Sequence, residues 1–127
     1  MIGLVSKQPT VIREMGGSER RILDKLLSVE FPGRDELRVQ AATALVSPIG
    51  ADGVPAFVFK IDDEAPLAAV RGRIPVEALS NAIPGKVVHC LLHVVDGRLS
   101  ELEFFREDGT QIKKLPNADD LIVSANR

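Results

Sequence analysis

Two strand-like segments joined by Asp96-Gly97 constrain this chain more than any other feature of its sequence. Residues 86–95 and 99–105 are rich in β-branched, leucine and aromatic side chains that alternate with polar ones, as in antiparallel strands. An Asp-Gly pair between two such runs predicts a tight hairpin. Because a shift of one residue exchanges the two faces of a strand, the length of this turn decides which side chains enter the core.

Two connections compete at this turn. A two-residue turn places Cys90 opposite Glu103 and mixes carboxylates into the apolar face. A three-residue loop that ends with Gly97 in the left-handed conformation places Cys90 opposite Leu102 instead. Burying an unpaired carboxylate costs several kcal/mol, so we predict the three-residue loop. The predicted core face of the hairpin then consists of Val88, Cys90, Leu92, Leu102 and Phe104.

The opposite face of this hairpin carries the candidate functional residues. The three-residue loop places His89 across from Glu103, with Glu101 on the same face. An imidazole beside carboxylates can orient a general base or contribute metal ligands, but such pairs also commonly do no more than stabilise a solvated sheet. A face that mixes apolar and polar side chains suits a partner surface. Its predicted members are His89, Leu91, His93, Leu99, Glu101, Glu103 and Phe105.

Other catalytic and ligand-binding arrangements are not favoured by the sequence. His89 and His93 lie about 13 Å apart along a strand, which is too far for both to bind one zinc ion. Cys90 falls among core positions, where a thiol is inert. The glycines form none of the spacings that cradle phosphates. We therefore predict no metal and no cofactor.

The N-terminal third of the chain predicts helices. Residues 1–17 are expected to form a leader, extended or loosely ordered, ahead of a single α+β domain over residues 18–127. Ser18 is a candidate cap for an amphipathic helix that should end at Phe31-Pro32-Gly33. A second short helix is expected from residue 34 or 35 to about residue 42.

The remaining segments predict strands. Alternation through residues 44–61 indicates a hairpin around a turn at residues 50–53, and residues 121–123 indicate a last short strand. Residues 67–79 fit either a strand or a short helix that begins at Pro75, and we favour the strand. The expected fold is α+β, with N-terminal helices packed on one face of an antiparallel meander of about five strands.

Composition limits the partners and the location. The chain has 127 residues, of which 45% are hydrophobic and 27% charged, enough for one domain with its own core. A formal net charge of −2 without a basic stripe argues against nucleic acid. One cysteine, with no signal peptide or membrane-spanning run, predicts a cytoplasmic protein that does not bind a membrane.

Three segments, residues 18–27, 31–37 and 92–109, carry a resemblance. The last contains Asp-Gly-x-Leu-x-Glu-Leu-Glu at residues 96–103, followed by Arg-x-Asp-Gly at residues 106–109. In these segments the chain resembles a group of small bacterial proteins classed as a domain of unknown function, with a likeness that extends from about Ile12 to Leu121. The resemblance implies a small fold of helices and antiparallel sheet, and it brings no activity.

Two functions follow as hypotheses. The leading one is a non-enzymatic interaction domain that binds a protein partner or self-associates as a homo-oligomer, because catalytic motifs are missing and one face of the sheet is mixed. The alternative is a small metal-assisted or acid/base hydrolase that uses His89 with Glu101 and Glu103. A concave pocket around these three residues would favour the alternative.

Overall fold

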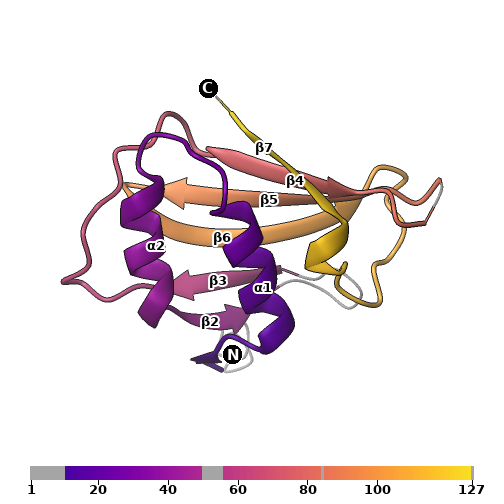
Figure 1. The fold of residues 1–127 in the computed structure, drawn as a ribbon. Helices are drawn as coiled ribbons and strands as arrows, with labels where there is room; N and C mark the ends of the chain where they lie inside the picture. The colour runs from indigo at the N-terminus through magenta and orange to yellow at the C-terminus, as the bar shows by residue number, and fades with distance from the viewer. Residues whose placement is uncertain (1–10, 50–55, 84, 127) are drawn as a thin grey trace, which may run out of the picture.

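The described residues fold into two α-helices and one antiparallel sheet (Figure 1). The computed structural model describes residues 11–49, 56–83 and 85–126, so the predicted turn at residues 50–53 lies outside the described residues. The sheet has seven strands in the order β1-β2-β3-β6-β5-β4-β7. The elements are β1 (Arg13–Glu14), α1 (Gly17–Leu26), α2 (Arg34–Thr43), β2 (Leu45–Pro48), β3 (Ala56–Lys60), β4 (Val76–Ser80), β5 (Val88–Val95), β6 (Arg98–Arg106), the 3₁₀ helix η2 (Ala118–Asp120) and β7 (Leu121–Ala125).

The α+β class is confirmed, whereas the strand count and the simple meander are not. The sheet contains seven strands rather than about five, and β5 and β6 lie between β3 and β4. Residues 67–73 form no strand, and the strand predicted within residues 67–79 begins only at Val76. None of the helices in the described part of the chain is long and apolar enough to cross a membrane.

The extra strand β1 lies inside the predicted leader and is tied to the first helix. Arg13 pairs with Val46 of β2, and its guanidinium donates to both carboxylate oxygens of Glu19 at 2.7 Å. Glu19 also accepts the Gly16 backbone N–H at 2.8 Å, which makes Gly16 the cap of α1 and leaves Ser18 inside the first turn, not at the cap. The hydrogen bond from Arg13 is the main cause that lowers the pKa of Glu19.

The hydrophobic core combines both helices with one side of the sheet. Figure 1 shows α1 and α2 in front of the strands. Register places Ala78, Cys90 and Phe104 side by side on neighbouring strands, and all three are buried. We call this side the core face and the opposite side the outer face. The helix residues in the same cluster are Ile22, Leu23, Leu26, Leu27, Leu37 and Ala41.

The predicted three-residue loop between β5 and β6 is wrong, because the turn has two residues. Asp96 and Gly97 both have positive φ, 51° and 78°, as in a type I′ turn, and Val95 pairs with Arg98. A Cβ on Gly97 would lie 3.1 Å from the carbonyl oxygen of Ala68, so both the backbone conformation and the available space require glycine here.

A β-bulge nevertheless restores the predicted faces. Val94 pairs with Leu99, but the next pair is His93 with Glu101, so Ser100 is an extra residue in β6. This insertion moves the register by one residue and turns the carboxylate of Glu101 away from the core. The predicted core face is therefore confirmed, with Val88, Cys90, Leu92, Leu102 and Phe104 all buried.

A fully buried glutamine on α2 holds the start of this bulge. The side-chain amide of Gln40 donates to the carbonyl oxygens of Pro66 and Gly97, both at 2.8 Å. Its carbonyl oxygen accepts the backbone N–H of Leu99 at 2.9 Å. Gln40 thereby satisfies polar backbone groups that the bulge leaves without strand partners, and it links α2 to the hairpin tip.

We expect Gln40→Leu to lower the free energy of unfolding by about 2–4 kcal/mol, because it removes three hydrogen bonds and leaves buried backbone groups unpaired. Urea denaturation followed by circular dichroism measures this change. The matched control is Val39→Ala, at the preceding, exposed position of α2, which should change stability by less than about 1 kcal/mol. A loss below about 1 kcal/mol for Gln40→Leu would contradict this role.

Candidate functional site

The outer face of the sheet is organised as rows of side chains across neighbouring strands. One row is apolar apart from a histidine, and the pairings place its members in a line through β7, β4, β5 and β6. The next row toward the hairpin tip contains Glu77, Leu91 and Glu103. The row after that contains His93, Glu101 and Val58. The apolar row through four strands consists of Ile122 on β7, Leu79 on β4, His89 on β5 and Phe105 on β6.

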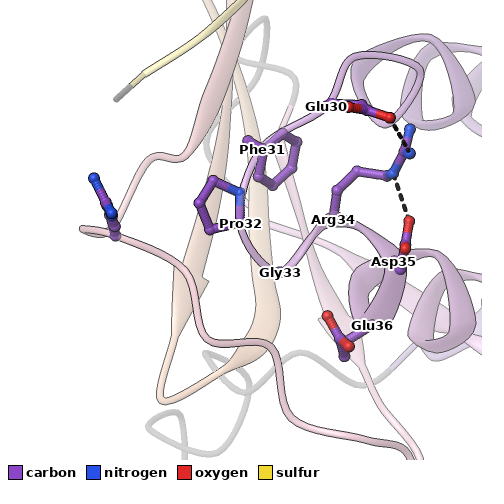
Figure 2. A pocket seen from close by; sticks show the side chains of 8 residues that line it. Glu30, Phe31, Pro32, Gly33, Arg34, Asp35 and Glu36 are labelled. Carbon is purple, nitrogen blue, oxygen red and sulfur yellow. Dashed lines mark hydrogen bonds and ion pairs between the residues drawn. The ribbon is translucent and has the colours of Figure 1, made fainter.

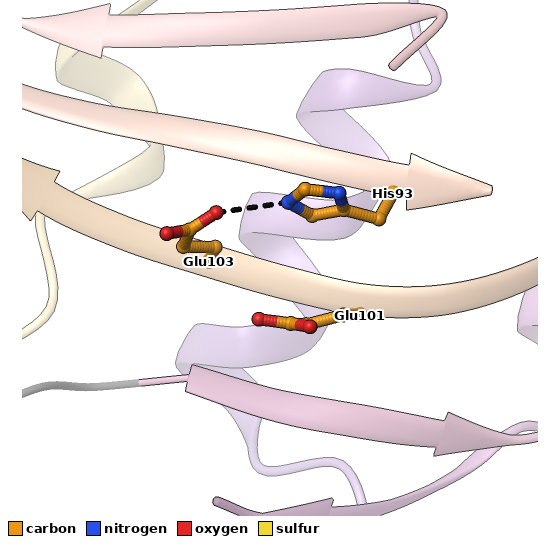
Figure 3. A group of neighbouring side chains, drawn as sticks. All are labelled: His93, Glu101 and Glu103. Carbon is orange, nitrogen blue, oxygen red and sulfur yellow. Dashed lines mark hydrogen bonds and ion pairs between the residues drawn. The ribbon is translucent and has the colours of Figure 1, made fainter. Parts of the chain in front are cut away.

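His93, Glu101 and Glu103 form the closest group of possible catalytic or metal-binding side chains among the described residues (Figure 3). Nε2 of His93 lies 2.9 Å from Oε1 of Glu103, its diagonal neighbour across the strand pair. One ligand atom from each of the three residues lies within 4.8 Å of the others. The side chain of His93 is only 12% exposed, against 39% for Glu103. The group is therefore a largely buried imidazole beside two partly buried carboxylates.

An arginine fixes the hydrogen positions on this imidazole. The Nε–H group of Arg73, in the loop before β4, donates to Nδ1 of His93 at 3.0 Å. A guanidinium can only donate, so Nδ1 must accept, and the ring hydrogen of the neutral imidazole lies on Nε2. Nε2 then donates to Glu103. The backbone of Arg73 is held as well, because its carbonyl oxygen accepts the Val94 backbone N–H at 2.7 Å. This hydrogen bond keeps the guanidinium in place.

His89 does not occupy the predicted position. It pairs with Phe105, not with Glu103, and the two rings stack with centroids 4.9 Å apart and planes 15° from parallel. Its Nε2 lies 2.8 Å from a carboxylate oxygen of Glu107, beyond the end of β6. The two-residue turn and the bulge each shift the register by one residue, so the observed pairing lies two residues from the predicted one along most of the hairpin. His93 therefore takes the place predicted for His89 beside Glu103.

Leu99 is the one predicted member of the partner face that lies elsewhere. It is 2% exposed and belongs to the core, because it precedes the extra residue Ser100 and pairs with the buried Val94. The other six predicted members lie on the outer face by register. Sequence reasoning missed Arg73, since a loop arginine carries no periodic signal.

Cys90 is a core residue, as predicted. Its side chain is fully buried beside Phe104 and Ala78, on the face opposite to both histidines. Burial raises the pKa of the Cys90 thiol. A thiol that stays protonated and inaccessible is not a nucleophile.

A cavity of about 560 Å³ lies apart from the outer face, at the start of α2 (Figure 2). Its walls carry the carboxylates of Glu30, Asp35 and Glu36, together with Arg34 and Arg71. Arg34 already donates to Asp35 at 2.8 Å and to the Leu27 carbonyl oxygen at 3.2 Å. The eight lining residues include neither histidine nor a hydroxyl or thiol, so the cavity differs from the outer-face group in having carboxylates without an imidazole.

Comparison with known proteins places the chain in a family. The family model of a domain of unknown function (DUF6984) matches residues 12–116. The chain belongs to this family. The match agrees with the resemblance predicted from the helix and hairpin segments, and it includes every strand of the sheet except β7. No curated protein and no solved structure matches the chain.

We expect Cys90 to be unreactive in the native protein, because its thiol is buried and its pKa is raised. With Ellman's reagent at pH 8, the folded chain should release far less than one equivalent of chromophore on a time scale at which the urea-unfolded chain reacts completely. Rapid labelling of the folded chain would place the thiol at an accessible position instead.

We expect His93 to be the Nε2–H tautomer at pH 8, because Arg73 donates to Nδ1. Long-range ¹H–¹⁵N correlation spectra of the imidazole rings distinguish the two tautomers directly. Arg73→Met removes the donor and should allow a mixture of tautomers at His93, whereas the His89 signals should not change. An Nδ1–H tautomer in the wild-type chain would rule out the Arg73 contact.

Proposed function

We propose that this domain binds another protein through the outer face of its sheet and that it is not an enzyme. The observation that supports this most is the row of Ile122, Leu79, His89 and Phe105 across four strands. Ile122 is 59% exposed and Phe105 is 38% exposed. Exposed apolar side chains in a continuous row rimmed by polar ones are typical of a protein-binding surface.

Charge favours a basic partner over a second copy of the chain. Glu101 and Glu103 lie on β6, the middle strand of the sheet, and Glu77 lies on β4. The cations of the outer face lie around them: Lys60 and Arg98 at strand ends, and Arg73 in the loop before β4, bonded to His93. Two copies that met through this face would bring like charges together. A partner with lysine or arginine around an apolar patch would instead complement both the row and the carboxylates.

A small hydrolase remains the second candidate, with His93 in the role predicted for His89. The hydrogen bond between His93 and Glu103 favours it, since a carboxylate can orient a general base. The described cavities lie at the start of α2, beside the ends of β2 and β3, between the helices and beside η2. None of these four has His93, Glu101 or Glu103 in its wall, which makes interaction the better supported proposal.

We expect Phe105→Ser to weaken binding of the physiological partner at least tenfold, about 1.4 kcal/mol, because it removes the large exposed ring from the row. Partners captured with the wild-type chain are purified and titrated by calorimetry at 50 and 500 mM NaCl, and added salt should weaken binding by screening the carboxylates.

The matched control is Val39→Ser, which removes an exposed apolar side chain from α2 and should leave affinity unchanged. Circular dichroism verifies that both variants are folded. A partner that binds Phe105→Ser as tightly as the wild type, or with no dependence on salt, would contradict the proposed surface. Self-association in light scattering that Phe105→Ser abolishes would replace the basic partner with a second copy.

A further inference from the structure

We propose that His93, Glu101 and Glu103 bind one divalent metal ion of the zinc or manganese class through Nε2 of the imidazole and one oxygen of each carboxylate. The proposal goes beyond protein binding, and its test on the isolated chain does not depend on a partner.

The ligand set is already assembled on two neighbouring strands. The three candidate atoms lie within 4.8 Å of one another, and His93 and Glu101 are directly paired in the sheet. Ligand atoms around a tetrahedral zinc ion lie about 3.3 Å apart. Glu101 and Glu103 both extend from β6 (Figure 3), and rotation of their side chains can bring the ligand atoms closer without backbone movement.

The group has two carboxylates and one neighbouring cation, Arg73, which is bonded to His93 and to neither carboxylate. Among the described residues, Glu101 has neither a hydrogen-bond nor an ion-pair partner, although the carboxylate of Glu103 lies next to it. The only hydrogen bond of Glu103 to a described side chain is the one from His93. An imidazole nitrogen combined with two carboxylate oxygens is a donor set that suits zinc, manganese and cobalt.

Arg73 sets a condition on metal binding that can be measured. A metal on Nε2 of His93 requires the ring hydrogen to move to Nδ1, and Nδ1 can then no longer accept from Arg73. The Arg73 hydrogen bond therefore opposes the ion, whereas a glutamine at this position can accept from Nδ1–H and support it.

The test is titration of the metal-free full chain with Zn²⁺ by calorimetry at pH 7.5, with Co²⁺ absorption as a second readout. The wild type should bind one equivalent. His93→Gln and Glu101→Gln should each weaken binding at least tenfold, and Arg73→Gln should strengthen it at least threefold. Glu101→Gln keeps the measurement interpretable if His93→Gln fails to fold, because the Glu101 side chain makes no hydrogen bond or ion pair with a described residue.

The matched control is His89→Gln, which removes the other histidine of the same face and should leave Zn²⁺ affinity unchanged. Absence of Zn²⁺ binding by the wild type would overturn the proposal. Equal affinity of His93→Gln and the wild type would also overturn it, as would loss of binding in His89→Gln. If the chain binds Zn²⁺ but Phe105→Ser leaves the affinity for a protein partner unchanged, the metal site stands and the proposed protein-binding surface fails.

Discussion

The three hydrogen bonds of Gln40 are the interaction on which the arrangement of the sheet depends. A two-residue turn at Asp96-Gly97 would, if both strands continued regularly, direct glutamates into the core. The bulge at Ser100 prevents this, but a bulge leaves backbone groups without partners in the ladder. Gln40 supplies the partner for the Leu99 N–H and also binds the Gly97 carbonyl oxygen, so a helix side chain stabilises an irregularity in a strand far away in sequence.

The loop before β4 supports the same irregularity from the other strand. Its Arg73 carbonyl oxygen accepts the Val94 N–H, and the Ala68 N–H donates to the carbonyl oxygen of Gly97. Because the Arg73 guanidinium also bonds to His93, the loop that stabilises the bulge sets the tautomer of the imidazole on the outer face. Arg73 therefore has two roles: its backbone carbonyl oxygen bonds to β5, and its side chain bonds to the imidazole of the candidate site.

The sheet separates an apolar environment on its core face from a polar one around the histidines of its outer face. The core face holds Cys90 among apolar side chains, and burial keeps the thiol protonated and inert. The outer face holds both histidines, with the carboxylates of Glu101 and Glu103 in the neighbouring strand. Adjacent strand residues point to opposite sides, so the thiol and the imidazoles are never close enough to act together.

The sequence by itself determined the α+β class, both helices, most of the strands and the two faces of the hairpin. These features follow from alternating and helical spacing of apolar residues, which can be recognised within a short segment of sequence. Only the tertiary structure decided that His93, not His89, lies beside Glu103 and that Leu99 is buried. These outcomes depend on a bulge whose partners, Gln40 and Arg73, are remote in sequence and leave no periodic trace. Turn length alone does not set the register, because long-range hydrogen bonds stabilise a bulge that shifts the register by one more residue.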